Sequence, residues 1–192
     1  MSLSTPVTRR ALRHTRAIAV QAYARDDGLW DLDAHITDIK VKDAMLASGP
    51  RPGGAPLHDL SLRLTVDTQF NIVDAEAVSD AVPYPGFCDT IAPDYKTQLV
   101  GLNLMRGFRH ELKQRISGIA GCTHLTELAQ ILPTAAVQAL AGEVLATNDA
   151  ATEHAGVPAQ QPFQLDKCHA LRTDGGAVAR FYPRWVAKAA PG

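Results

Sequence analysis

Alternation of apolar and polar side chains over residues 58–67 is the feature that most limits the possible fold. One set of alternate residues is His58, Leu60, Leu62, Leu64 and Val66, and the other is Asp59, Ser61, Arg63, Thr65 and Asp67. Successive side chains of a β-strand point to opposite faces, so this period of two predicts a strand with one apolar and one polar face. A sheet built from such strands needs a second layer over its apolar face.

Three further segments have strand-like sequences and form two hairpins with the first. Residues 14–25 and 29–41 flank an Asp-Asp-Gly turn, in which Asp-Gly supplies the positive φ that a tight hairpin requires. Residues 58–67 and 70–78 flank a short turn at Thr68-Gln69. Two hairpins predict one antiparallel sheet of about four strands.

The second half of the chain has the periodicity of helices. We expect helices over residues 94–100 and 107–117, and a longer one after Gly121 that runs toward Val144 and is kinked or broken at Pro133. Strands followed by helices indicate an α+β fold, with a curved antiparallel sheet packed by helices from the C-terminal half.

The length of 192 residues suits a single domain over residues 1–192. Residues 1–11 lack apolar periodicity and are expected to be a loose N-terminal arm. Residues 42–56, rich in Gly and Pro, are expected to be a loop or flap without regular structure. Residues 147–162 are expected to be a mobile excursion.

The charge balance limits the classes of partner. With 19 basic and 20 acidic residues the net charge is -1, which argues against a general binder of nucleic acid or membrane surfaces. No apolar run approaches the roughly 20 residues needed to span a bilayer, and no secretory signal follows the N-terminus, so a cytoplasmic location is expected. The three cysteines are odd in number and widely spaced, and we expect them to be reduced.

A Cys/His set is the first candidate site. Cys122 and His124 lie where a long helix begins, with Thr123 as a good N-cap residue. With Cys88 and Cys168, they would offer thiolate and imidazole ligands to zinc or iron. The alternative is that these are buried structural cysteines, because the set has no CxxC pair and comes from distant segments.

The polar face of residues 29–41 is the second candidate. His35 lies two residues from Asp33 and shares a strand face with Asp31, and carboxylates near an imidazole raise its pKa and orient its ring. His35 would then transfer protons, with Asp31 or Asp33 as its orienting partner. The alternative is a solvated sheet face.

Basic residues supply possible substrate anchors, for which we consider Arg63 on the strand and Arg109 on the second helix. Basic residues crowded on one helix are also typical of a solvated face. His58, at the start of an apolar strand face, is more typical of a core residue. The sequence has no GxGxxG, P-loop, GxSxG or HExxH motif.

The chain resembles a bacterial family of domains of unknown function. The resemblance rests on five motifs: Gly28-Leu29-Trp30-Asp31 with Ala34-His35 and Asp38; His58-Asp59 with Leu62-Arg63-Leu64-Thr65-Val66-Asp67; Tyr84-Pro85-Gly86 with Cys88; Gly121-Cys122-Thr123-His124-Leu125; and Cys168-His169-Ala170 with Tyr182-Pro183-Arg184-Trp185. It implies that one compact unit contains these segments, and it brings no established activity.

These observations favour a small-molecule enzyme that uses general acid–base chemistry, with a lyase or hydratase acting on an aromatic or acyl intermediate as the expected class. It is expected to be a homo-oligomer and to need no cofactor. Two alternatives stay open. One is a zinc- or iron-binding or adaptor protein built on the Cys/His set, and the other is a non-catalytic subunit of a complex.

Overall fold

The computed structural model describes residues 3–147 and 161–187. The chain divides into two compact units, Met1–Ala136 and Val137–Gly192. This division does not test whether the chain is one domain, so the single-domain expectation stays a prediction. Residues 3–13 form neither helix nor strand, whereas the predicted excursion at 147–162 lies mostly outside the described residues.

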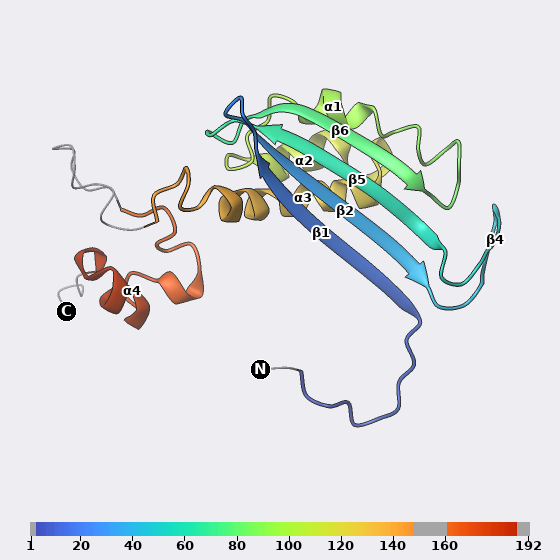
Figure 1. Ribbon diagram of the computed structural model, residues 1–192, viewed down its shortest axis with the longest axis horizontal. Coiled ribbons are helices and arrows are strands. Elements are labelled where there is room, and N and C mark those ends of the chain that lie inside the picture. Colours follow the sequence, from blue (N-terminus) through green and yellow to red (C-terminus); the bar gives the residue numbers. More distant parts are fainter. Residues whose placement is uncertain (1–2, 148–160, 188–192) are drawn as a thin grey trace. The chain divides into compact units, whose positions relative to one another are not determined.

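The first unit is built on the predicted four-stranded antiparallel sheet (Figure 1). Its strands are β1 (His14–Ala24), β2 (Trp30–Lys40), β5 (Pro56–Val66) and β6 (Ile72–Ala81), in the spatial order β1-β2-β5-β6. The alternation has the predicted effect in β2, where Leu32 and Ile36 are fully buried and His35 is exposed. The α+β fold class is therefore confirmed.

The prediction that residues 42–56 lack regular structure was wrong. They contain a short hairpin of β3 (Ala44–Leu46) and β4 (Gly49–Arg51), with Met45 opposite Pro50. Each strand of a two-stranded ribbon keeps a free edge, where a proline's missing N–H costs little. Gly49 takes a φ of 118° at the turn.

Helices α1 (Asp94–Leu99), α2 (Phe108–Ile116) and α3 (Thr123–Leu140) follow, with a 3-10 turn, η1 (Gly118–Ala120), before α3. Figure 1 shows α1 and α2 on the same face of the sheet as the beginning of α3. The core lies between these layers and includes the fully buried side chains of Leu62, Leu64, Tyr95, Leu112, Ile116, Leu125 and Leu128.

Of the kink or break predicted at Pro133, the break is wrong. α3 continues through Pro133 and ends at Leu140, short of Val144. Gly142 has a φ of 86°, and the N–H groups of Val144 and Leu145 donate to the Leu140 carbonyl. A left-handed glycine that turns the chain back onto the last helical carbonyls ends the helix here.

The second unit contains the end of α3 and three short helical segments, η3 (His169–Leu171), α4 (Gly176–Phe181) and η4 (Pro183–Trp185). Leu140, Leu165 and Val178 are buried apolar side chains of this unit. The Gln164 amide and the Tyr182 hydroxyl both donate to the Thr147 carbonyl. Across the described part of the chain, no helix is long and apolar enough to cross a membrane.

Candidate functional site

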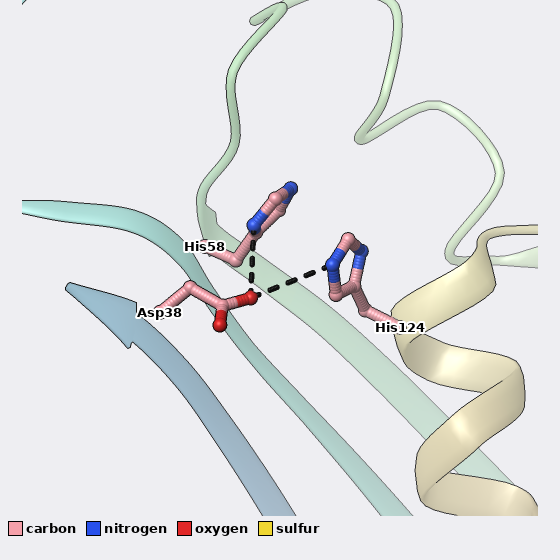
Figure 2. A group of neighbouring side chains, drawn as sticks. All are labelled: Asp38, His58 and His124. Carbon is pink, nitrogen blue, oxygen red and sulfur yellow. Dashed lines mark hydrogen bonds and ion pairs between the residues drawn. The ribbon is translucent and has the colours of Figure 1, made fainter. Parts of the chain in front are cut away.

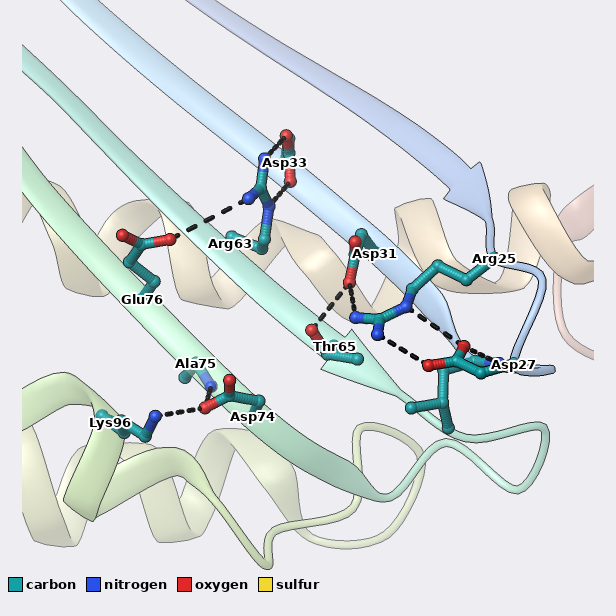
Figure 3. Close-up of polar contacts among 11 residues, drawn as sticks. Arg25, Asp27, Asp31, Asp33, Arg63, Thr65, Asp74, Ala75, Glu76 and Lys96 are labelled. Carbon is teal, nitrogen blue, oxygen red and sulfur yellow. Dashed lines mark hydrogen bonds and ion pairs between the residues drawn. The ribbon is translucent and has the colours of Figure 1, made fainter.

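Asp31 and Asp33, the predicted partners of His35, form hydrogen bonds with residues of neighbouring strands and turns instead (Figure 3). Asp33 lies opposite Arg63 and accepts two hydrogen bonds from it, at 2.7 and 2.6 Å, while Asp31 accepts from Thr65 and Arg25. Residues two apart on a strand are about 6.5 Å apart, whereas directly opposite residues have Cβ atoms about 4.5–5.5 Å apart. Neither Asp31 nor Asp33 therefore orients His35.

His35 instead contacts Asp59, with its Nε2 2.6 Å from Asp59 Oδ1, and 47% of its side chain is exposed. It lines an open concavity of about 370 Å³ on the polar face of the sheet, together with Asp33 and Arg63. Arg109 lies elsewhere, on α2 beside Gly107 and Pro133. In the β3–β4 hairpin, the Ser48 hydroxyl donates to the Pro83 carbonyl and the Arg51 guanidinium donates to the Val82 carbonyl. These hydrogen bonds hold the hairpin against the residues after β6 and not over His35.

The predicted Cys/His set is only partly assembled. Cys88, Cys122 and His124 line one cavity of about 450 Å³, whereas Cys168 is exposed in the second unit. Among the described residues, these four do not form a group with the spacing of metal ligands. His124 belongs to a different group.

That group consists of Asp38, His58 and His124, whose side chains converge from three elements (Figure 2). Asp38 Oδ2 lies 3.1 Å from His58 Nδ1 and 3.5 Å from His124 Nε2. The three candidate ligand atoms all lie within 4.8 Å of one another. The centroids of the two imidazole rings are 3.7 Å apart, at an interplanar angle of 31°.

Strand register brings two of these three side chains, Asp38 and His58, together. Asp38 and His58 are direct partners in the β2–β5 pair, at the end of the sheet where a register shift follows Asp38. Asp38 also continues the apolar face of β2, which makes it a buried charge with 2% relative exposure. The sequence carried this signal, because a charged residue at the end of one apolar face and a histidine at the start of another were both visible.

The first turn of α3 supplies His124. Cys122 precedes the helix and its carbonyl accepts from Thr126 N, so the prediction of Cys122 at the helix N-terminus is confirmed. The Tyr95 hydroxyl donates to the Cys122 carbonyl at 2.8 Å and accepts from Cys122 N at 3.0 Å. Gly121 has no room for a side chain, because a Cβ there would lie 2.2 Å from the Ile116 carbonyl oxygen.

The carboxylate of Asp38 is held from the other side by β1. Arg16 donates from Nε to Oδ1 and from Nη2 to Oδ2, both at 2.8 Å, and His14 Nε2 lies 2.8 Å from Oδ1. Arg16 Nη1 also donates to Glu127 Oε2 on α3 at 2.8 Å. The hydrogen bond from Arg16 is the main reason that the pKa of Asp38 falls to about 2.

The two imidazoles of the group have lowered pKa values. Burial is the main cause for both, and the proximity of His124 lowers the pKa of His58 further. A lowered pKa favours the neutral imidazole, the form that can accept a proton or bind a metal ion.

The cavity of about 450 Å³ is bordered by His58 and His124 and has a largely apolar wall. Phe87, Ile119 and Tyr84 are large hydrophobic side chains that line it and are nonetheless exposed to solvent. Among the described residues that line it there is no Lys or Arg. The size and lining are typical of a pocket for a small organic molecule.

Comparison with known proteins places the cluster within a family. The model of a family described as "Protein of unknown function (DUF2889)" matches residues 14–138, a span that includes Asp38, His58 and His124 and excludes Cys168. No curated protein and no solved structure matches the chain. Because the matched span is more than half of the chain, this protein belongs to the DUF2889 family.

Proposed function

We propose that this protein is a small-molecule enzyme, and that it performs general acid–base chemistry in the cavity bordered by His58 and His124. One observation carries the proposal: a buried carboxylate and two half-buried imidazoles converge at the border of a largely apolar cavity of about 450 Å³. Titratable groups gathered beside such a cavity are a common signature of an active site.

The cavity supports an organic substrate with an apolar body. Its wall offers Phe87, Tyr84 and Ile119 as exposed apolar contacts, and the described residues that line it include no Lys or Arg. An aromatic or acyl intermediate fits this lining better than a phosphorylated or polyanionic compound, which would need Lys or Arg.

The reaction class that we propose is that of a lyase or hydratase. In the hydratase direction, a base takes one proton from water, the oxygen forms a bond to one carbon of a double bond, and a proton is delivered to the other carbon. The balance needs no oxidant or reductant. A positioned acid–base group typically contributes about 10²–10⁴-fold to such a step.

We place proton transfer at the Asp38–His58–His124 cluster rather than at His35, the candidate from the sequence. Asp38 holds Nδ1 of His58, and the second ring nitrogen of His58 points away from Asp38 (Figure 2). A carboxylate on one nitrogen fixes the tautomer and leaves the other nitrogen to exchange a proton. His35 lies on an open face with 47% of its side chain exposed.

The proposal is tested with a panel of α,β-unsaturated aromatic acids and acyl thioesters, in which loss of the conjugated double bond is followed by ultraviolet absorbance. We expect turnover of at least one compound, with kcat/KM lowered at least about 100-fold by His58→Gln. His110→Gln, on the exposed surface of α2, is the matched control and should retain the wild-type rate.

Two outcomes would contradict the proposal. Full activity of His58→Gln combined with loss of activity in His35→Gln would return the site to the polar strand face. If no compound of the panel is turned over and none shifts the NMR resonances of Phe87 or His124, the adaptor or non-catalytic-subunit alternative takes its place.

A further inference from the structure

The geometry points to a metal site: we infer that Asp38, His58 and His124 bind one divalent first-row transition-metal ion, zinc or iron, at the border of the cavity. This inference deepens the proposed function and rests on it for the location of the chemistry. The ligand set differs from the Cys/His set that the sequence suggested, and shares only His124 with it.

The spacing of the ligand atoms is the first argument. Two atoms bound to one ion at about 2.0–2.2 Å lie about 2.8–3.6 Å apart when they subtend roughly 90–110° at the metal. Asp38 Oδ2 lies 3.1 Å from His58 Nδ1 and 3.5 Å from His124 Nε2, both within this range. Asp38 Oδ2 therefore lies at coordination-shell separations from both nitrogens, and the three ligand atoms lie within 4.8 Å of one another.

The donor types select the class of ion. Two imidazole nitrogens and one carboxylate oxygen suit zinc and iron(II), whereas magnesium and calcium prefer sets made of oxygen alone. Sites closed by four protein ligands are typically structural, and three protein ligands leave a position for water or substrate. Here His58 and His124 line the cavity, so the remaining positions of the ion can face a bound small molecule.

The surroundings of Asp38 resemble those of a ligating carboxylate. His14 and Arg16 Nε hold Oδ1, so that Oδ2 is directed at the two imidazoles. Arg16 Nη2 also donates to Oδ2, but a carboxylate oxygen has two lone pairs and can accept this bond while it binds an ion. Hydrogen bonds that orient a ligating carboxylate are a regular part of metal sites.

Charge compensation alone does not account for the cluster. Arg16 forms ion pairs with both Asp38 and Glu127, so its single positive charge is shared between two carboxylates. The local excess of negative charge therefore favours the binding of a cation.

A bound ion would also supply the acid–base group of the proposed reaction. Zinc lowers the pKa of a bound water to about 7, so the water loses its proton and becomes a hydroxide nucleophile near neutral pH. The proton that the water loses is balanced by the one delivered to the other carbon, so no oxidant or reductant is required. With the ion bound, the two imidazoles act as ligands. Without it, His58 itself would transfer the proton.

The test uses full-length protein without an affinity tag, freed of metal by chelation and then titrated with Zn²⁺ by calorimetry. We expect one equivalent to bind per chain, with the affinity lowered more than about 100-fold by His58→Gln and by His124→Gln. His14→Ala, which alters only the support of Asp38, should lower it by about 10–100-fold. His110→Gln is the matched control and should bind as the wild type does.

Two measurements keep the test decisive. Circular dichroism of each variant shows whether it is folded, so that loss of binding by a folded His58→Gln or His124→Gln is attributable to the ligand. The absorption spectrum of the Co²⁺ form reports the donor type, because thiolate ligands add an intense near-ultraviolet charge-transfer band. We expect no such band, and unchanged binding in Cys88→Ser and Cys122→Ser.

Failure of this inference is distinguishable from failure of the proposed function. Binding of Zn²⁺ no tighter than millimolar, or binding lost in the cysteine variants and kept in the histidine variants, overturns the metal site. Turnover of the panel by metal-free protein would then leave the proposed enzyme intact. Stoichiometric metal without turnover or ligand-induced shifts would instead keep the metal site and remove the proposed reaction.

Discussion

At the scale of single residues, Asp38 is the most constrained position in the described chain. It is a carboxylate with 2% relative exposure, and it contacts side chains from β1, β5 and α3. A buried charge is tolerated only when it is paired and hydrogen-bonded, because the loss of hydration is otherwise not offset. Arg16 provides this pairing with two hydrogen bonds.

Removing Arg16 should therefore destabilise the protein. For Arg16→Ala we expect the free energy of unfolding to fall by about 1–3 kcal/mol, because Asp38 keeps its burial and loses its strongest partner. Arg63→Ala is the control, since Arg63 and Asp33 form an exposed pair whose loss should cost less than about 1 kcal/mol. Urea denaturation in the presence of a chelator measures both, and equal effects would show that Asp38 does not depend on Arg16.

The effect of Arg16→Ala should depend on pH in a direction fixed by Asp38. Its folded pKa of about 2 lies below the ordinary value of 3.8, so the stabilisation is complete above pH 3.8 and is lost as the pH falls toward 2. The difference in stability between wild type and Arg16→Ala should shrink as the pH falls below about 4. A difference that grows on acidification would contradict this assignment.

At the scale of elements, the position of α3 depends on one buried tyrosine. The Tyr95 hydroxyl bonds to the backbone of Cys122 and lies 2.8 Å from the Thr126 hydroxyl, which donates to the Ile116 carbonyl. These contacts join α1 to the last turn of α2 and the first turn of α3. His124 lies within that first turn, so Tyr95 positions a member of the cluster without contacting a ligand.

Tyr95→Phe should accordingly weaken both the fold and the site. We expect a loss of about 1–3 kcal/mol in the free energy of unfolding, because Cys122 N–H loses its acceptor. Tyr23→Phe, which removes an exposed hydroxyl bonded to Gln21, should change stability by less than about 0.5 kcal/mol. Urea denaturation gives both values. Weaker Zn²⁺ binding by folded Tyr95→Phe would support the positioning role, and unchanged binding would remove it.

At the scale of the whole molecule, the family match and the first unit nearly coincide. The match covers residues 14–138 and the first unit ends at Ala136, so the sheet, the cluster and the cavity all lie in the shared part. The second unit begins at Val137, inside α3. The expectation of a homo-oligomer stays a prediction.

A helix that runs through the boundary between the units should couple their unfolding. We expect one calorimetric transition for the whole chain, with equal calorimetric and van't Hoff enthalpies, as for a single domain. Tyr95→Phe should lower the midpoint of that transition as a whole. Two transitions, of which Tyr95→Phe shifts one, would instead show two domains.

The sequence by itself determined the local structure of the first unit. Side-chain alternation and helical spacing depend only on chain geometry over a few residues, so β2, β5 and α2 were predicted within a few residues of their observed ends. The N-terminus of α3 was equally visible, because Gly121 and the apolar spacing after it are local signals. The weakly patterned residues 42–56 were not, and their hairpin was missed.

Only the tertiary structure decided which polar side chains meet. The sequence assigned Asp31 and Asp33 to His35 because they are near in the chain, but strand register gave Asp33 to Arg63 and placed Asp38 opposite His58. The sequence grouped His124 with the three cysteines, whereas α3 docks it against β2 and β5 beside Asp38 and His58. Register and helix packing are set by burial of the apolar faces over the whole unit, and a local pattern carries no record of which distant residues this burial brings together.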